Sequence, residues 1–548
     1  EKGALTHCPG TGEETGQALV DSEKIAQVVF TGSKEVGTMI SSHAGRRLYH
    51  NPLHQIDYPA KPVTEMGGKN AIIVAENAEL DETMAGIIYS AFAHAGQKCS
   101  AASRVIVSNK IKDKLIERLK EAVRDVEVGP AYEYKTLINP LITGGEKERL
   151  MKQTREAEKE AEQSGGRVVI DRSNEQFDGF CVGPAVYEVP LEYSLNPETF
   201  CHRELFAPVI HVTGFDTLNE AVEIFNASDY ALTGGIYSQS QDDIDFCTDR
   251  MEAGNIYVNR KITGSRVFIE PFGGFKMSGT GPKAGSKQYV RSFHIEKPAF
   301  PEMECEGDKY YLENIGTQDF DLVGRSKLGF EQRVQLFKDA KSLLITDLRT
   351  EVNHRYDHYK IVNLMFQLSD WIDKNLYDFI YAPHPNRKIP GQISFADYRL
   401  IKEKSVVITC NRTPHATTVL YVLSGIALGS GMNIITTTKE AYKFWKNLES
   451  LNNSGILIKK MSTRYISRLF QQNSDISNVI SDMPAKKEDD LLKLIFAGNR
   501  NAKRLIQLLS SLDSPSCKKF EEYLLKFINI RSFAINTVRF GAPLEIEK

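Results

Sequence analysis

The chain has 548 residues, more than the roughly 250 to 300 at which one hydrophobic core stops growing, so at least two domains are expected. Its 41% hydrophobic and 25% charged residues are typical of a globular protein and exclude wholesale disorder. The 68 basic and 71 acidic side chains give a net charge of -3, without the basic excess of a typical phosphate-backbone binder. This balance argues against nucleic acid as a main partner.

Cysteine usage and the first residues indicate the compartment. The eight cysteines form no C-x-x-C pair and show no zinc-like spacing, so no metal site is predicted and a reducing, cytoplasmic location is expected. The sequence begins Glu1-Lys2-Gly3, without Met and without the apolar segment of a signal peptide. We therefore expect a cytoplasmic chain that is a piece of a longer protein.

Short β-branched runs alternate with helical stretches in the first part of the chain. This alternation predicts α/β layers around a mostly parallel sheet. The expected strands include residues 28–30, 71–74, 105–107, 168–170 and 256–258, and the expected helices include 111–126 and 146–163.

A composition change near residues 297–304, where prolines and acidic residues follow a glycine-rich segment, predicts a domain boundary. The two expected domains are residues 1–299 and 300–548. The second is also predicted to be α/β, with a helix at 353–376 and a turn region at 387–392.

Residues 405–438 are predicted to form a strand, a helix and a strand. The uncharged stretch 416–435 is long enough for a membrane span, but its Thr, Ser and Gly content and the strand before it favour a buried helix. A weak internal repeat, in which residues 494–499 resemble 28–33, suggests that the two halves share a fold, with chance similarity as the alternative.

Two glycine-rich turns near the start are candidate phosphate sites. Gly10 lies in one turn, and in the other a strand breaks at Gly32 before a helix capped by Ser33. A helix N-terminus offers free N–H groups and a positive dipole end to a phosphate. Taken alone, each turn is also explained by an ordinary strand-to-helix connection that binds no phosphate.

Two reactive side chains lie in small-residue turns. Glu65 precedes the pair Gly67-Gly68, and Cys99 follows the helix-like residues 84–95. A surface carboxylate and an inert core cysteine are the alternatives. A thiolate attacks carbonyl carbon well, however, and its thioester can then be hydrolysed with the help of a base.

Two later segments complete a set of motifs. They are Glu204-Leu205-Phe206-Ala207-Pro208 and Pro271-Phe272-Gly273-Gly274-Phe275-Lys276-Met277-Ser278-Gly279. The motifs E-x-G-G-K, G-Q-x-C, E-x-F-x-P and P-F-G-G-x-x-x-S-G follow one another in this order, and the sequence thereby resembles the aldehyde dehydrogenase family. The resemblance implies α/β architecture, with Rossmann-type coenzyme and catalytic domains followed by a degenerate aldehyde dehydrogenase-like α/β domain.

The tail of the last motif, residues 278–285, is most similar to glutamate semialdehyde (pyrroline-5-carboxylate) dehydrogenases, especially the aldehyde-oxidising part of proline utilisation A enzymes. The resemblance covers residues 1 to about 295. It implies NAD-dependent oxidation of L-glutamate γ-semialdehyde to glutamate in proline catabolism, a homo-oligomer, and a possible proline dehydrogenase domain upstream. In that family this loop grips the amino-acid end of the substrate, and the glycines allow backbone N–H groups close to a carboxylate.

The resemblance also implies residue roles. Cys99 would be the nucleophile and Glu65 the base. The cofactor would contact Gly10, Gly32, Ser33, Glu204 and Phe206, and the substrate would contact Ser100, Ser278, Gly279 and Thr280.

Some family features have no counterpart here. The oxyanion-hole asparagine and a ribose-binding lysine lie upstream of residue 1, and losing one oxyanion donor costs about 100- to 1000-fold in rate. Two alternatives follow: the chain is an inactive fragment of an active parent, or it is a nonenzymatic assembly module. A third alternative is a different semialdehyde dehydrogenase. After residues 405–438 no motif of the family recurs, Cys410 and Cys517 are interpreted as structural, and the second part is expected to be noncatalytic.

Overall fold

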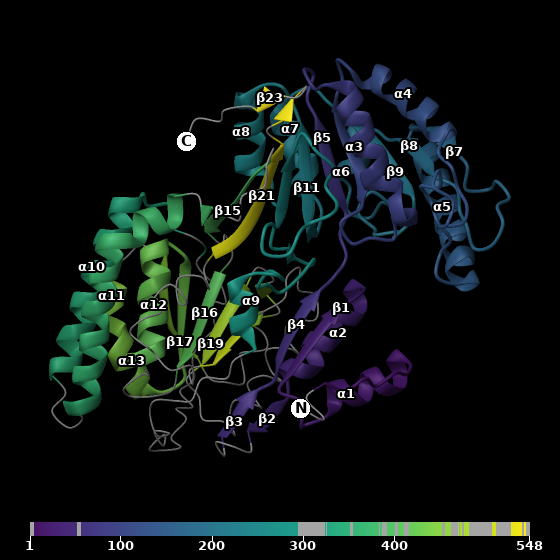
Figure 1. The fold of residues 1–548 in the computed structure, drawn as a ribbon. Helices are drawn as coiled ribbons and strands as arrows, with labels where there is room; N and C mark the ends of the chain where they lie inside the picture. The colour runs from purple at the N-terminus through teal and green to yellow at the C-terminus, as the bar shows by residue number, and fades with distance from the viewer. Residues whose placement is uncertain are drawn as a thin grey trace.

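A computed structural model describes residues 5–51 and 56–293 and shorter stretches beyond them (Figure 1). The later described stretches are 324, 326–350, 355–382, 384–385, 392–400, 404–409, 416–451, 455–461, 469–470, 472–473, 476–481, 507–510, 528–536, 538–539 and 542–543. The predicted boundary at 299/300, most of the predicted turn at 387–392 and the repeat segment at 494–499 lie outside the described residues.

A ten-stranded sheet organises the first part of the chain. Its spatial order is β14 (His384–Pro385), β15 (Gln392–Leu400), β21 (Ile528–Asn536), β12 (Asn255–Val258), β11 (Thr233–Tyr237), β5 (Asn70–Val74), β6 (Ala102–Ser108), β9 (Val209–Phe215), β8 (Ala185–Glu188) and β7 (Arg167–Asp171). Strands β21 to β8 run parallel, whereas β7, β15 and β14 pair antiparallel with their inner neighbours. The predicted α/β class with a mostly parallel sheet is confirmed.

The central strands are buried on both faces. In β5, Ile72 and Val74 join one hydrophobic core, and Ala71 and Ile73 join another. This split follows from the two-residue period of a strand, and burying each large aliphatic side chain stabilises the fold by about 1.5 to 3 kcal/mol.

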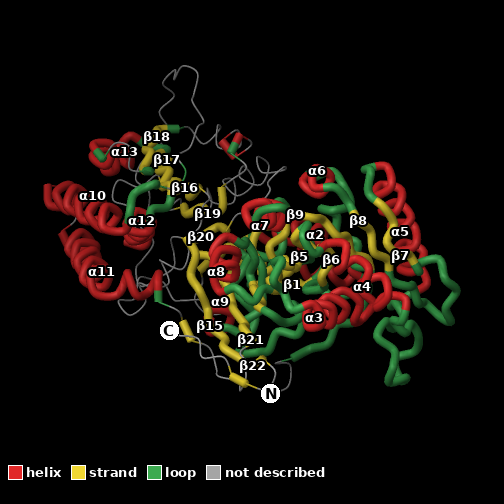
Figure 2. The backbone as a smooth tube through the Cα atoms, turned by 90° about the horizontal axis from the view of Figure 1, so that it is seen from above, coloured by secondary structure: helices red, strands yellow, loops and turns green. Residues whose placement is uncertain are grey.

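Helices cover both faces of this sheet (Figure 2). One core includes side chains of α3 (Leu80–Phe92), α4 (Lys112–Arg124) and α5 (Gly144–Gln163), and the other includes α7 (Leu218–Asn226) and α8 (Gln241–Arg250). The helices predicted at 111–126 and 146–163 are thus present with slightly shifted ends.

A small unit precedes the large sheet. Strand β1 (Gln27–Thr31) pairs parallel with β4 (Lys61–Glu65), and α2 (Lys34–Gly45) connects them through the antiparallel pair β2 (Leu48–Asn51) and β3 (Ile56–Pro59). The remaining elements of this part are η1 (Gly12–Gly16), α1 (Gln17–Asp21), η2 (Ala93–Gly96), α6 (Leu191–Leu195), β10 (Tyr230–Ala231), β13 (Phe275–Lys276) and α9 (Lys287–Ser292).

A second, parallel sheet lies in the later part, in the order β18 (Ile456–Lys460), β17 (Gly431–Thr436), β16 (Lys404–Thr409), β19 (Ile476–Ser481) and β20 (Gln507–Ser510). The other elements are α10 (Phe330–Thr350), α11 (Arg355–Tyr381), α12 (Ala416–Leu428), α13 (Lys439–Trp445), η3 (Lys446–Ser450), β22 (Val538–Arg539) and β23 (Ala542–Pro543). Side chains of α10, α11 and α12 share one hydrophobic core with β16 and β17.

The strand–helix–strand prediction for residues 405–438 is confirmed. The uncharged stretch contains α12, which ends at Leu428, and β17, which begins at Gly431. It is therefore not one continuous helix, and within the described residues no helix combines the length and apolarity needed to cross a bilayer.

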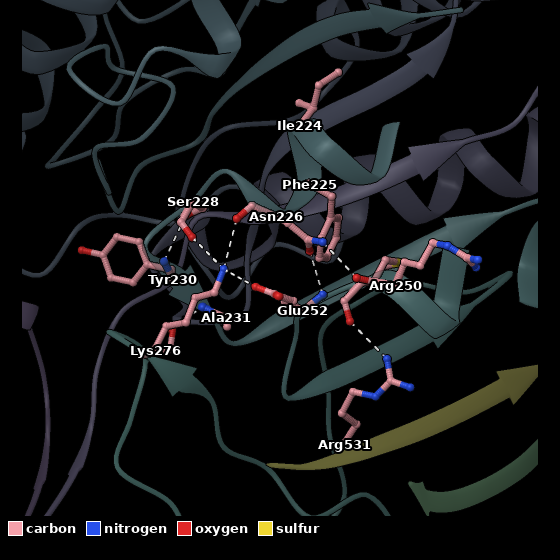
Figure 3. Close-up of polar contacts among 12 residues, drawn as sticks. Ile224, Phe225, Asn226, Ser228, Tyr230, Ala231, Arg250, Glu252, Lys276 and Arg531 are labelled. Carbon is pink, nitrogen blue, oxygen red and sulfur yellow. Dashed lines mark hydrogen bonds and ion pairs between the residues drawn. The ribbon is translucent and has the colours of Figure 1, made fainter. Parts of the chain in front are cut away.

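The two parts of the chain share the large sheet, because β15 and β21 extend it beyond β12 (Figure 1). Arg531 of β21 is almost fully buried, and Figure 3 shows its side chain reaching toward the chain between Arg250 and Glu252. It donates to the carbonyls of Thr248, in the last turn of α8, and Met251, just after that helix. This strand therefore contacts the first part through both its backbone and its side chain.

Replacing Arg531 with Met should destabilise the chain by about 2 to 3 kcal/mol, because two buried carbonyls lose a charged donor. Denaturant unfolding followed by fluorescence measures this change. The control is Arg250→Met, since Arg250 donates to Phe246 O from an exposed position. An equal loss in both variants would contradict the anchoring role of Arg531.

Candidate active site

The turn that carries Cys99 is fixed by close backbone packing. His94, Ala95 and Gly96 have positive φ angles of 57°, 55° and 67°, which reverse the chain after α3. A Cβ at Gly96 would lie 2.2 Å from the Ala207 carbonyl oxygen, so only glycine fits there. The cysteine that follows is partly exposed and is a free thiol.

Asn70 ties this turn to the sheet. Its Nδ2 donates to the carbonyls of Cys99 and Ala101, both at 2.8 Å, and its Oδ1 accepts from Thr233 N at 2.9 Å. A single buried amide thus links β5, the start of β6 and β11. The position of the Cys99 backbone follows from this linkage.

Glu65 ends β4, and its carboxyl group is enclosed by the glycine-rich loop of residues 272–285. Met66 N donates to Ser278 O at 2.8 Å, and Glu65 forms an isolated antiparallel bridge with Gly279. Both Glu65 oxygens are buried and, within the described residues, have no hydrogen-bond partner. An unpartnered buried carboxyl group is costly for stability and is typical of a functional site.

Glycine leaves room where the loop touches this carboxyl group. A Cβ at Gly273 would lie 2.9 Å from Glu65 Oε1, and one at Gly279 would lie 3.1 Å from Oε2. Side chains at either position would displace the carboxylate. The glycines of the motif therefore give Glu65 its space.

The environment raises the pKa of Glu65 to about 8, mainly through burial. The charge of Lys283 acts in the opposite direction, as does the Gly274 backbone, although its geometry falls short of a hydrogen bond. Burial also raises the pKa of the Cys99 thiol, and the charges of Glu65 and Glu204 raise it further. A carboxyl group that titrates near neutral pH is suited to general-base catalysis.

Glu204 lies beside the glycine pair that follows Glu65. Its Oε1 accepts from Gly68 N at 2.9 Å, and a Cβ at Gly67 would lie 1.8 Å from its Oε2. Burial raises the pKa of Glu204, while Gly68 N–H and Lys69 act in the opposite direction. Phe206, two residues later, has φ 54° and remains exposed.

The Ser33-capped end of α2 faces the same region. Ser33 Oγ accepts from Val36 N at 3.3 Å, and Gly32 N donates to Glu65 O at 3.1 Å. The charges of Glu35 and Lys34, in the first turn of α2, act on Glu204. This helix start offers N–H groups to an anionic group, which fits the pyrophosphate of a dinucleotide.

Gly10 lies in the exposed turn before η1, where a Cβ would overlap the Thr15 side chain. The structure therefore explains the glycine by local packing, and the predicted cofactor contact of Gly10 remains a prediction.

The predicted substrate residues lie around Glu65 and Cys99. Ser278 Oγ is fully buried and accepts from Ala231 N at 3.0 Å, and Thr280 Oγ1 accepts from Thr64 N at 3.0 Å. These hydroxyl groups hold the loop against its neighbours. Ser100 is buried next to Cys99, and its carbonyl accepts from Thr233 Oγ1 at 3.3 Å.

Sequence reasoning did not assign roles to Asn70 and Lys283, although both lie in motifs that it singled out. A polar residue at the start of the apolar run 70–74 was the available signal for Asn70. Lys283 Nζ donates to Gly254 O at 2.5 Å, Asn255 Oδ1 at 2.6 Å and Pro271 O at 3.3 Å. A lysine within a glycine-rich loop looks exposed from sequence alone, and only the fold shows its burial.

The protein-family model described as the aldehyde dehydrogenase family matches residues 1–297. The chain belongs to the aldehyde dehydrogenase family. The resemblance inferred from the order of the motifs is thereby confirmed.

Two relatives named 1-pyrroline-5-carboxylate dehydrogenase support this aldehyde dehydrogenase assignment. One is from Bacillus pumilus, and the other, 1-pyrroline-5-carboxylate dehydrogenase 2, is from Bacillus subtilis. Each is 33% identical to this chain over 303 residues. Each match covers 55% of this chain and 56% of the relative, so the chain spans about half the length of the curated relatives that it matches.

A solved structure extends the fold comparison to the second part. Proline utilization A from Corynebacterium freiburgense covers 96% of this chain and 43% of its own, with 20% sequence identity and a TM-score of 0.57. At this identity the similarity shows the fold alone.

The reactivity of Cys99 should report the charge of Glu65. Because the Glu65 carboxylate raises the pKa of the thiol, the Glu65→Gln variant should alkylate at Cys99 with a midpoint at lower pH than the unmodified chain. Iodoacetamide labelling across a pH series, with Cys99 followed by peptide mass spectrometry, measures both midpoints. The exposed Glu198→Gln is the control, and equal midpoints in all three proteins would refute the coupling.

Proposed function

We propose that this chain carries the catalytic machinery of an NAD-dependent L-glutamate γ-semialdehyde dehydrogenase. The observation that carries the proposal is the buried, unpartnered Glu65 carboxyl group under the glycine-rich loop, whose charge acts on the Cys99 thiol. Membership of the aldehyde dehydrogenase family supports oxidation of an aldehyde, and the names of the relatives from Bacillus support the substrate.

In this proposal the Cys99 thiolate attacks the aldehyde carbon and forms a thiohemiacetal. Loss of hydride from that carbon leaves a thioester on the sulfur atom. Glu65 then removes a proton from water, the resulting hydroxide attacks the thioester carbon, and the carboxylate product leaves as the Cys99 thiolate is released. The raised pKa of Glu65 suits this step, because the group can accept a proton near neutral pH.

NAD would supply the hydride acceptor when bound. The start of α2, with Gly32 and Ser33, is proposed to hold its pyrophosphate, with Gly10 as a further contact. Glu204 and Phe206 are proposed to lie at the nicotinamide-ribose end. The charges of Glu35 and Lys34, in the first turn of α2, act on Glu204, which supports this grouping.

The amino-acid end of the substrate is proposed to bind at the loop of residues 272–285. Gly279 would present backbone N–H groups to the substrate carboxylate, with Ser278 and Thr280 fixing the loop and Ser100 beside the nucleophile.

The setting of the enzyme is also a proposal. We propose a cytoplasmic homo-oligomer that acts in proline catabolism, with a proline dehydrogenase domain elsewhere in the full-length protein. Residues 1–299 would form the catalytic unit. Residues 300–548 would form a noncatalytic unit, because they keep α/β architecture without the thiol and base motifs.

Substrate choice separates this proposal from another semialdehyde dehydrogenase. The full-length protein should reduce NAD with glutamate semialdehyde at a kcat/KM at least about tenfold above that with succinate semialdehyde, since only the former offers an α-amino acid end to the loop. Absorbance of reduced NAD measures the rates. The Cys99→Ala variant should lose activity with both substrates and still bind NAD, and retained turnover would refute the role of Cys99.

Glu65→Gln should separate the two chemical steps. Thiohemiacetal formation and hydride loss need no base at this position, whereas thioester hydrolysis does, so a burst of reduced NAD followed by slow turnover is expected. In the unmodified enzyme the hydrolysis rate should rise as pH passes about 8, because Glu65 loses its proton there. Stopped-flow absorbance measures both, and a variant with no burst and unchanged steady-state rate would exclude Glu65 as the base.

A further inference from the structure

Lys283 is buried within the glycine-rich loop and is fully engaged as a donor. Its Nζ donates to three oxygen acceptors, namely Gly254 O, Asn255 Oδ1 and Pro271 O. Three acceptors match the three N–H bonds of the ammonium form, whereas a neutral amine has only two. The acceptors thus suit the charged form of a side chain in a site from which solvent is largely excluded, and that burial lowers its pKa to about 7.

The acceptors of Lys283 lie at the start of β12 and at the entrance to the loop. Asn255 completes the connection, since its Nδ2 donates to Pro271 O at 3.1 Å and its Oδ1 also accepts from Gly273 N at 3.4 Å. The far end of the loop is thus joined to its beginning through one lysine and one asparagine.

Gly273 lies close to both Lys283 and Glu65. The Cβ position of Gly273 lies 2.9 Å from Glu65 Oε1 and 3.2 Å from Lys283 Cα. The Lys283 backbone and the Glu65 carboxyl group therefore both lie against Gly273, and the charge of Lys283 acts on Glu65. Because both groups are buried, solvent screens their interaction only weakly.

We propose that Lys283 is a positioning residue for Glu65, which anchors the loop that encloses the carboxyl group and favours its ionised form through the lysine charge. This inference rests on the proposed role of Glu65 as the base. It assigns Lys283 no contact with the aldehyde or the cofactor.

Other groups also face this pair. The Cys99 thiol and the Tyr289 hydroxyl of α9 interact electrostatically with Glu65, and Arg531 of β21 acts on Lys283. Burial lowers the pKa of Lys283 and the charge of Glu65 raises it, while Arg531 lowers it. Of these groups, Lys283 is the cation that acts on Glu65, so removing it should raise the pKa of Glu65.

The test is an infrared titration of Glu65 in the full chain. The band of the protonated carboxyl group, assigned by its loss in Glu65→Gln, should persist to higher pH in Lys283→Met by an amount on the order of one pH unit. Because the band follows Glu65 directly, the measurement needs no turnover. Failure of the proposed aldehyde oxidation would therefore be seen separately.

Lys276 provides the matched control within the same loop (Figure 3). Its Nζ lies 2.7 Å from Glu252 Oε2 and donates to the carbonyls of Asn226 and Ser228 at 3.1 and 3.2 Å. Lys276→Met removes the same charge from the loop but not from the neighbourhood of Gly273, so the Glu65 midpoint should stay in place.

Two results would overturn the proposal: an unchanged Glu65 midpoint in folded Lys283→Met, or an equal shift in Lys276→Met. Circular dichroism checks folding, and Lys283→Gln, which keeps donors and removes the charge, replaces the Met variant if that one unfolds. Hydrogen exchange of the backbone amides measures separately whether Lys283 anchors the loop. Peptides covering residues 272–284 should exchange faster in Lys283→Met than in Lys276→Met, and equal exchange would refute the anchoring role.

Discussion

The enclosure of the Glu65 carboxyl group is the constraint on which the arrangement of the site depends. Removing a carboxyl group from water without a hydrogen-bond partner is unfavourable, so the surrounding chain has to be held in place by other interactions. The glycine-rich loop supplies the enclosure but, being rich in glycine, has high conformational freedom when unfolded. Its hydrogen bonds to the rest of the fold must offset that entropy.

These hydrogen bonds come from three directions. Ser278 joins the loop to β10, Thr280 joins it to β4, and Lys283 joins it to the start of β12. Each side chain is buried or part-buried where it forms its bond, so each bond is protected from competition with water. The loop is therefore fixed relative to both the small β1–β4 unit and the large sheet, and Glu65 lies where the two units meet.

The sequence predicted the elements with strong local signals. The β-branched runs in β5 and β6 were identifiable because strands buried on both faces are nearly all apolar, and Cys99 and Glu65 were identifiable because several motifs occurred in a fixed order. The roles of Asn70 and Lys283 could not be identified from the sequence, since tertiary structure determines which residues contact them. Thr233, for example, is far from Asn70 in the sequence and reaches it only because β11 pairs with β5.

For a related reason, the sequence did not predict that β15 and β21 belong to the large sheet. Alternating or apolar residues predict a strand but not the sheet to which it belongs, and the composition change near residue 300 suggested separate units. Pairing with β21 covers the edge of β12 that would otherwise be open. Because β11 and β21 hold β12 on both sides, the backbone at Asn255 is fixed, and its side chain can serve as a rigid acceptor for Lys283.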